Sequence, residues 1–202
     1  MQGLGRHVVF VDSNVLYSRT ARDWLGLRYI EGDLFTVFWT EEVLADVVHH
    51  LRKKHPTWDG AKTARVRDRI AATFEVGRVT DFTVDRSYQG EDPDDAHVHA
   101  AAVACNADIL LTFNTKHFVW EGSEAYYDTM APDEFFTLVD DTAPLMVRSV
   151  TCQQRDYWMT RTSEVDLRGR LRAASCPQFA ERVLHHLHEL AGIHVADGNG
   201  DA

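Results

Sequence analysis

An acidic segment at the start of an alanine-rich stretch constrains this chain more than any other feature. Residues 92–95, Asp-Pro-Asp-Asp, place three carboxylates within four positions, and like charges this close repel one another. The alanine-rich stretch that follows predicts a helix, and the apolar run at residues 109–112 predicts a buried strand. A fold accommodates such acids most easily when a cation binds near them. The segment therefore predicts half of a β-α-β unit with a charged site at the start of its helix.

A second acid follows a predicted strand near the N-terminus. Residues 8–11 are a short apolar run rich in β-branched side chains, which is typical of a strand buried on both faces. Asp12 comes directly after it, and helix-like apolar spacing continues over residues 15–30. Open α/β sheets bind ligands at the carboxyl ends of their strands. Asp12 is therefore a candidate site residue, and the alternative is that Asp12 or Ser13 caps the next helix.

A third acid lies in the middle of a predicted helix. Residues 36–39 predict a strand, and Thr40 is a suitable N-cap for a helix over residues 41–54. Asp46 lies inside this helix beside its apolar stripe, although Asp is a poor helix former. Its position suggests a polar cavity or a ligand, and the alternative is a partly exposed surface residue.

The order of the elements predicts the fold class. A helix over residues 61–76 and a strand over residues 79–84 continue an alternation of strands and helices through residues 7–113. This alternation predicts an α/β fold with an open, mainly parallel sheet and helices on both faces.

The C-terminal third has a different character. Strand signals stop beyond Trp120, and a helix start near Pro132 opens a run of helices that ends with an apolar stripe after Pro177. We therefore predict an α/β domain over residues 1–130, a C-terminal α-helical appendage over residues 131–192, and a polar tail over residues 193–202.

Composition narrows the classes of function. The net charge of −10 over 202 residues counts against a protein that holds nucleic acid by bulk electrostatics. Residues 49–78, however, contain eight Lys or Arg against three acids, whereas residues 121–145 contain seven acids and no Lys or Arg. The basic stretch is either a binding surface or a solvated helix face. Three scattered cysteines, no membrane-length apolar run and no signal-peptide layout favour the cytoplasm and no membrane association.

The polar ends of several elements are expected to meet at one crevice of the sheet. They are Asp12, Asp46, Asp92, Asp95 and Asn114, the last of which follows a strand. Carboxylate and amide oxygens are the ligands that hard divalent ions such as Mg²⁺ and Mn²⁺ prefer. An ion held this way polarises a phosphoryl oxygen and lowers the pKa of a bound water, which serves phosphodiester hydrolysis.

Four sequence blocks, taken in order, resemble those of PIN-domain nucleases. They are Val11-Asp12-Ser13-Asn14-Val15-Leu16, Ala45-Asp46, residues 92–102 and residues 107–114. The chain looks most like the VapC-like toxins of bacterial toxin–antitoxin pairs. The resemblance implies an endoribonuclease that uses Mg²⁺ or Mn²⁺ and leaves 5′-phosphate and 3′-hydroxyl ends. It also implies RNA as the substrate, a cognate antitoxin protein that covers the site, and a homodimer.

The resemblance also assigns roles to individual residues. Catalytic roles fall to Asp12, Asp46, Asp95 and Asn114, and metal binding to Asp12, Asp46, Asp92 and Asp95, although the family usually has Glu where Asp46 stands. The residues expected to support these ligands are Ser13, Asn14, Thr112 and Glu42, which lies one turn before Asp46. Separately from the resemblance, the basic stretch makes Arg52, Lys53 and Lys54 candidates for RNA contact. His117, three residues past Asn114, is a further candidate for contact with RNA near the cut.

Three other functions fit the sequence less well. A phosphatase with Asp12 as nucleophile needs a second Asp where this chain has Asn14. A Rossmann nucleotide binder needs a glycine-rich loop after the first strand, and none is present. A PIN scaffold that binds RNA or a protein without cleaving is the main alternative, but clustered acids without a metal cost stability and repel phosphates.

Overall fold

The computed structural model describes residues 7–31, 34–118 and 125–192. The chain forms two compact units, Met1–Pro132 and Asp133–Ala202. The predicted tail over residues 193–202 lies outside the described residues. The predicted division into a nuclease domain over residues 1–130, a helical extension over residues 131–192 and a tail stays a prediction.

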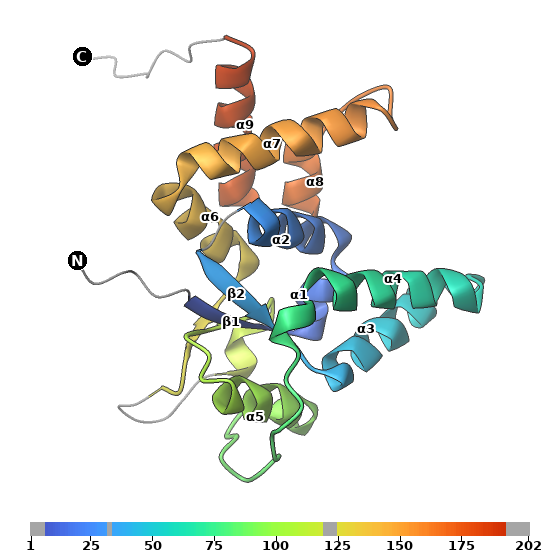
Figure 1. The fold of residues 1–202 in the computed structure, drawn as a ribbon, viewed down its shortest axis with the longest axis vertical. Helices are drawn as coiled ribbons and strands as arrows, with labels where there is room; N and C mark the ends of the chain where they lie inside the picture. The colour runs from blue at the N-terminus through green and yellow to red at the C-terminus, as the bar shows by residue number, and fades with distance from the viewer. Residues whose placement is uncertain (1–6, 32–33, 119–124, 193–202) are drawn as a thin grey trace. The chain divides into compact units, whose positions relative to one another are not determined.

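The first unit contains a parallel sheet whose strands follow the spatial order β2-β1-β3-β4 (Figure 1). The strands are β1 (His7–Val11), β2 (Phe35–Phe38), β3 (Ile109–Leu111) and β4 (Asp128–Met130). Val9 of β1 aligns with Val37 on one side and with Ile109 on the other. The two central strands are rich in fully buried apolar residues, as expected for strands covered on both faces. The predicted α/β class with a parallel sheet is confirmed.

The helices of this unit lie on both sides of the sheet. They are α1 (Ser13–Tyr17), α2 (Arg19–Glu31), α3 (Glu41–Lys54), α4 (Gly60–Thr73) and α5 (Ala96–Ala104). In Figure 1, α2 and α5 lie on opposite sides of β1 and β2. Three short 3₁₀ turns connect these elements, namely η1 (Glu75–Gly77), η2 (Pro93–Asp95) and η3 (Thr115–His117).

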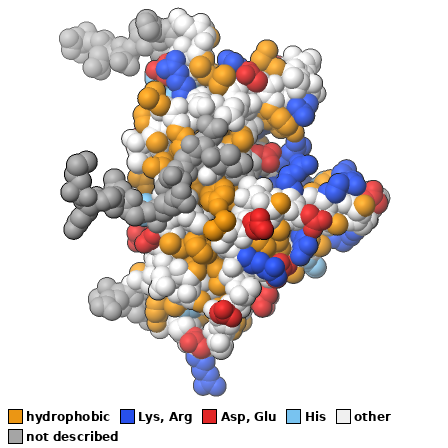
Figure 2. All heavy atoms as spheres, viewed as in Figure 1, with side chains coloured by type: hydrophobic (Ala, Val, Ile, Leu, Met, Phe, Trp, Pro, Cys, Tyr) orange, Lys and Arg blue, Asp and Glu red, His pale blue; other side chains and the backbone are white. Residues whose placement is uncertain are grey.

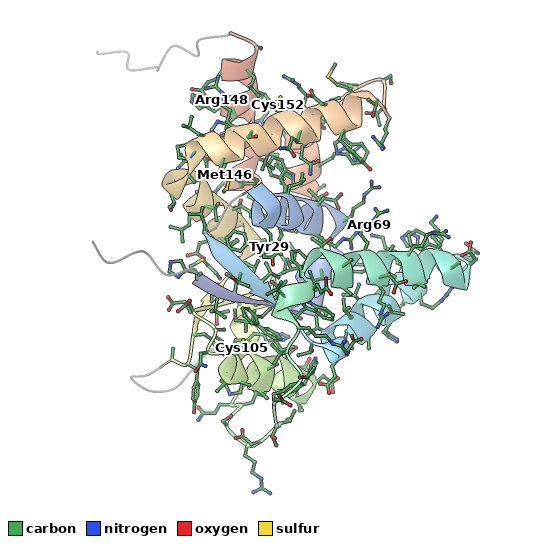
Figure 3. The ribbon with its side chains drawn as sticks, viewed as in Figure 1. Tyr29, Arg69, Cys105, Met146, Arg148 and Cys152 are labelled. Carbon is green, nitrogen blue, oxygen red and sulfur yellow. The ribbon has the colours of Figure 1, made fainter. Side chains whose placement is uncertain are left out.

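Helices α3 and α4 form a hairpin beside the sheet (Figure 1). The hydroxyl of Thr40 accepts a hydrogen bond of 3.1 Å from the backbone N–H of Val43, which confirms the predicted N-cap of α3. Beyond α4, the Phe74 ring packs edge-on against Tyr29 of α2, with 5.4 Å between the ring centroids. Figure 3 labels Tyr29. These contacts join the hairpin to the rest of the unit.

Three predictions about elements are wrong. The helix expected over residues 15–30 is interrupted at Ser18, whose extended backbone separates α1 from α2. Residues 79–84 form no strand, because pairing with the sheet edge stops at a single bridge between Trp39 and Arg78. The chain also returns to the sheet at β4, a short polar edge strand that carries no apolar run for sequence analysis to find.

The second unit is helical, as predicted. Its helices are α6 (Pro132–Thr142, whose first residue closes the first unit), α7 (Pro144–Met159), α8 (Leu167–Ala173) and α9 (Pro177–Leu190). The rings of Phe136 and Phe179 meet in its core with centroids 5.3 Å apart. The carboxylate of Asp133 accepts hydrogen bonds from the backbone N–H groups of Gln178 and Phe179, at the start of α9. This carboxylate therefore ties α6 to the first turn of α9.

Among the described residues, none of the helices combines the length and the apolar character needed to cross a bilayer.

Candidate active site

Asp12 lies at the carboxyl end of the sheet. It directly follows β1, its side chain is only 4% exposed, and its backbone N–H donates to the carbonyl of Leu111 in β3. Asp12 occupies the N-cap position of α1, yet its carboxylate makes no capping hydrogen bond with that helix. The capping alternative therefore does not explain this buried carboxylate.

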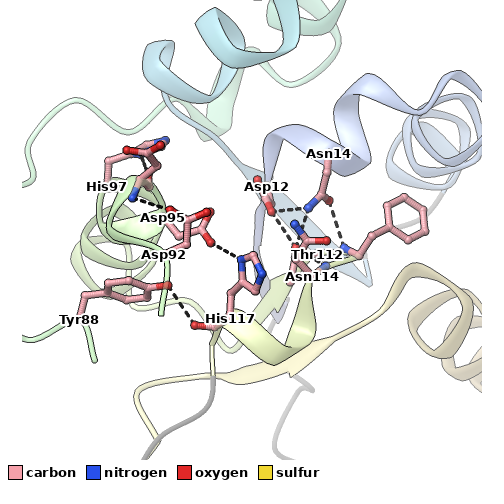
Figure 4. Close-up of polar contacts among 11 residues, drawn as sticks. Asp12, Asn14, Tyr88, Asp92, Asp95, His97, Thr112, Asn114 and His117 are labelled. Carbon is pink, nitrogen blue, oxygen red and sulfur yellow. Dashed lines mark hydrogen bonds and ion pairs between the residues drawn. The ribbon is translucent and has the colours of Figure 1, made fainter. Parts of the chain in front are cut away.

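Two polar side chains hold the Asp12 carboxylate in place (Figure 4). Its Oδ2 accepts hydrogen bonds from Asn14 Nδ2 at 2.6 Å and from Thr112 Oγ1 at 2.7 Å. Asn14 Nδ2 also donates to Thr112 Oγ1, and Asn14 Oδ1 accepts from the backbone N–H of Phe113. These bonds link the start of α1 to the end of β3. The structure thus brings Asn14 and Thr112 to Asp12, while Ser13 is buried beside it in the first position of α1.

The acidic segment forms the turn η2 and enters α5. Asp92 Oδ1 accepts the backbone N–H of Asp94 and so caps the turn. Asp95 is 19% exposed at the start of α5, and its pKa is raised by burial and by the nearby charges of Asp12 and Asp92. The acid after β1 and the acids before α5 thus lie close enough for their charges to repel, and their shared role as metal ligands stays a prediction.

His117 lies among these acids. Its Nδ1 is 2.6 Å from Asp95 Oδ2, and this hydrogen bond raises the pKa of His117. Asp92, Asp95 and His117 each offer one ligand atom, and the three atoms lie within 4.8 Å of one another. Figure 4 shows the His117 ring between Asp92 and Asp95 on one side and the Asp12 group on the other. Asn114, three residues earlier, is exposed at the rim, and its backbone N–H donates to Thr112 Oγ1.

A sequence model of the PIN domain matches residues 8–116, which is more than half of the chain. The chain belongs to the PIN-domain family. Members of this family are generally nucleases. The matched range runs from β1 into η3 and includes Asp12, Asp46, Asp95 and Asn114. Neither a curated protein nor a solved structure matches the chain.

Two residues that sequence analysis did not single out, Tyr88 and Gly90, support one side of this PIN-domain site. The Tyr88 hydroxyl donates to the backbone carbonyl of His117 at 3.0 Å. Burial and the charges of Asp95, Asp92 and Asp12 raise the pKa of Tyr88 to about 12. At Gly90, an added Cβ would overlap both the Tyr88 hydroxyl and the His117 carbonyl. The only local signal is a glycine directly before the acidic segment.

Asp46 lies apart from the Asp12 network. Its side chain is 44% exposed, and its Oδ2 is 3.5 Å from His97 Nε2 on α5. Glu42, one turn earlier, is exposed in the first turn of α3. The structure therefore pairs Asp46 with a histidine, and its role as a metal ligand stays a prediction.

The predicted RNA-binding residues of the α3–α4 hairpin differ in their surroundings. Arg52 donates to the Trp58 carbonyl and to Thr63 Oγ1, so it closes the turn of the hairpin. Lys53 and Lys54 are exposed in the last turn of α3. Figure 2 shows Lys and Arg side chains gathered over this hairpin, with acids between them.

The ligand atoms at the sheet edge fit a divalent ion. Asp92 and Asp95 offer carboxylate oxygens, which hard cations prefer, and together with His117 they form the group whose ligand atoms lie within 4.8 Å of one another. Asp12 is not a member of this group among the described residues, although its negative charge and those of Asp92 and Asp95 repel one another. A bound cation would relieve this repulsion. The residues present therefore fit the Mg²⁺ or Mn²⁺ expected of a PIN nuclease.

Proposed function

We propose that this protein is an endoribonuclease that depends on Mg²⁺ or Mn²⁺. One observation carries the proposal: Asp12 is buried directly after β1 with its Oδ2 held by Asn14 and Thr112, and beside it lie Asp92, Asp95 and His117, whose ligand atoms are within 4.8 Å of one another (Figure 4). A protein that only binds RNA or a partner has no need of buried acids that repel both one another and a phosphate.

The residues of the site divide the work. Asp92 and Asp95 would hold the ion, with Asp12 as a further carboxylate beside them, and the ion would supply charge stabilisation of the phosphate and a more acidic water. Asn14 and Thr112 hold the Asp12 carboxylate through its Oδ2. Asn114 is exposed at the rim, where its amide can contact a phosphate or the attacking water. Asp46 lies in α3, apart from the Asp12 network, and its exposed carboxylate would contact a second ion or the RNA.

Cleavage of a structured RNA with and without chelator tests this proposal. We expect cleavage with Mn²⁺, none with EDTA, and a loss of at least about 100-fold in the Asp12→Asn variant, because a lost charge contact to a metal costs several kcal/mol. Asp12→Asn keeps the shape of the side chain, so folding is checked by circular dichroism. Asp68→Asn, an exposed acid of α4, is the matched control. Cleavage by Asp12→Asn at the wild-type rate would show that the site is misassigned.

The biological role that we propose is that of a cytoplasmic toxin, paired with an antitoxin protein that covers the site and assembled as a homodimer. The support is the resemblance of the four sequence blocks to VapC-like toxins. Expression in a bacterial host should arrest growth for the wild-type chain and not for Asp12→Asn. Light scattering should give twice the mass of one chain. If cells that express an active nuclease grow normally, the toxin role is refuted and the proposed enzymatic activity remains. If the folded chain has no nuclease activity, a PIN scaffold that binds without cleaving is favoured.

A further inference from the structure

His117 lies beside the carboxylates that would bind a metal ion. It ends η3, six residues after β3, and its side chain is one third exposed. Its Nδ1 points at Asp95 Oδ2 from 2.6 Å. Asp92, Asp95 and His117 each offer one ligand atom, and these three atoms all lie within 4.8 Å of one another. The imidazole therefore shares the space in which the two carboxylates would meet a cation.

The backbone of His117 is fixed from both sides. Its N–H donates to the Asn114 carbonyl, and its carbonyl accepts the hydroxyl of Tyr88. Phe118, the next residue, is buried. Gly90 lies so close that an added Cβ would overlap the His117 carbonyl. The imidazole is thus presented from a rigid support, as preformed metal ligands are.

The chemistry of Nδ1 follows from what it faces. Nδ1 of His117 forms a hydrogen bond of 2.6 Å with Asp95 Oδ2. A ring nitrogen of a neutral imidazole can also serve as a metal ligand, so an ion bound by Asp92 and Asp95 would take the place of this hydrogen bond. The three ligand atoms already lie within 4.8 Å of one another, so small side-chain rotations would bring them to one ion.

We propose that His117 is a nitrogen ligand of the ion and gives this site a preference for Mn²⁺ over Mg²⁺. The inference rests on the metal site of the proposed function. Imidazole nitrogen suits transition ions, whereas Mg²⁺ keeps oxygen ligands and waters. A mixed set of two carboxylates and one imidazole therefore selects the softer ion, although both ions suit carboxylates alone.

Metal titration of the full chain tests the selectivity without any RNA. MnCl₂ and MgCl₂ are titrated by calorimetry into the wild type, His117→Ala and His117→Gln. We expect the Mn²⁺ affinity to fall at least about tenfold in both variants, as for loss of a metal-site contact. The Mg²⁺ affinity should change less than about threefold, because Mg²⁺ gains little from a nitrogen ligand. His55→Ala, in the turn of the α3–α4 hairpin, is the control. Equal losses for both ions, or for neither, would overturn the inference.

Pulsed electron paramagnetic resonance of bound Mn²⁺ tests the bond itself. The wild type should show a nitrogen hyperfine coupling that disappears in His117→Ala and His117→Gln and remains in His55→Ala. A wild-type spectrum without nitrogen coupling, or coupling that survives in both His117 variants, would overturn the ligand role. Weaker RNA binding with unchanged metal affinity would instead make His117 an RNA contact. Neither metal measurement requires catalysis. If nitrogen is bound to the ion in a protein that cleaves no RNA, the proposed nuclease function is refuted while the ligand role of His117 stands.

Discussion

One hydroxyl group, that of Thr112, connects three parts of the site. Thr112 has no exposed surface, and its Oγ1 donates to Asp12 Oδ2 while accepting from Asn14 Nδ2 and from the backbone N–H of Asn114. Buried polar groups that are fully paired hold one arrangement, and removing one partner leaves the others unpaired. At the scale of the residue, the orientation of Asp12 depends on a side chain that meets no solvent.

Replacement of Thr112 by Val removes this hydroxyl and keeps the shape of the side chain. We expect a loss of about 1–3 kcal/mol in the free energy of unfolding, because buried donors and acceptors lose their partner. RNA cleavage should fall about 10–100-fold, as for other groups that orient metal ligands. Urea denaturation and initial cleavage rates measure the two effects. Thr142→Val, which removes an exposed hydroxyl that bonds the Leu138 carbonyl, is the control and should change both by little. A Thr112→Val variant with normal activity would show that Asp12 does not need this support.

The loop that carries Tyr88 and Gly90 is anchored to α5 by a buried histidine. His99 is 1% exposed, with Nε2 2.9 Å from Ser87 Oγ and Nδ1 3.0 Å from the Tyr127 hydroxyl. Ser87 in turn donates to Asp85. Burial lowers the pKa of His99, so the fold favours the neutral ring. At the scale of the element, this contact connects the loop to the helix that Asp95 precedes.

The lowered pKa of His99 makes stability depend on pH. The unfolded chain takes up the proton near pH 6.5, before the folded chain does, so the stabilisation is present above that pH and lost as the pH falls. Between pH 8 and pH 5, wild-type stability should therefore fall by more than that of His99→Gln. Urea denaturation at both pH values gives the difference, in which contributions shared by the two proteins cancel. Equal losses in both proteins would show that His99 is not held neutral.

The elements that could be predicted from sequence are those with local signals. The apolar run of β1 and the Thr40 cap of α3 are local signals, and both elements form where predicted. The strand β4 could not be found, because it is a polar edge strand that forms only by pairing with β3. The break at Ser18 was missed because the apolar spacing continues on both sides of it.

The candidate site was predicted in part for a similar reason. Asp12 and Asp95 follow or precede elements with clear local signals, and the strand order then brings them to one edge. The contact of His117 with Asp95 depends on the path of η3 and on a glycine in another loop, and no local pattern encodes either. The pairing of Asp46 with His97 likewise needs α3 and α5 to be placed in space.

Charge is distributed unevenly over the molecule. The whole chain carries a net charge of −10, yet residues 49–78 contain eight basic residues and three acids. This stretch covers much of the α3–α4 hairpin, where Lys54 lies over the Tyr17 ring and Lys62 over the Trp58 ring. Basic and aromatic groups together suit single-stranded RNA. At the scale of the molecule, the described part of this acidic chain thus has a basic surface on the α3–α4 hairpin, where we expect RNA to bind.

Neutralising the exposed lysines of this surface should weaken RNA binding and its salt dependence. Each phosphate contact to a single strand contributes about 0.7 to the slope of log affinity against log salt. Lys53→Gln combined with Lys54→Gln should therefore reduce the slope by up to about 1.4. Fluorescence anisotropy in the Asp12→Asn background avoids cleavage during the titration. Arg148→Gln, an arginine that pairs with Glu189 in the helical unit, is the control. An unchanged slope would return the stretch to the role of a solvated helix face.

Gly90 gives the molecule an unusual weakness. The space that a methyl group would need at this position is filled by the Tyr88 hydroxyl and the His117 carbonyl. The loop can follow its present path only because glycine has no Cβ. The substitution Gly90→Ala, which adds a single carbon, should therefore disable the protein while every acid, amide and imidazole of the site stays intact.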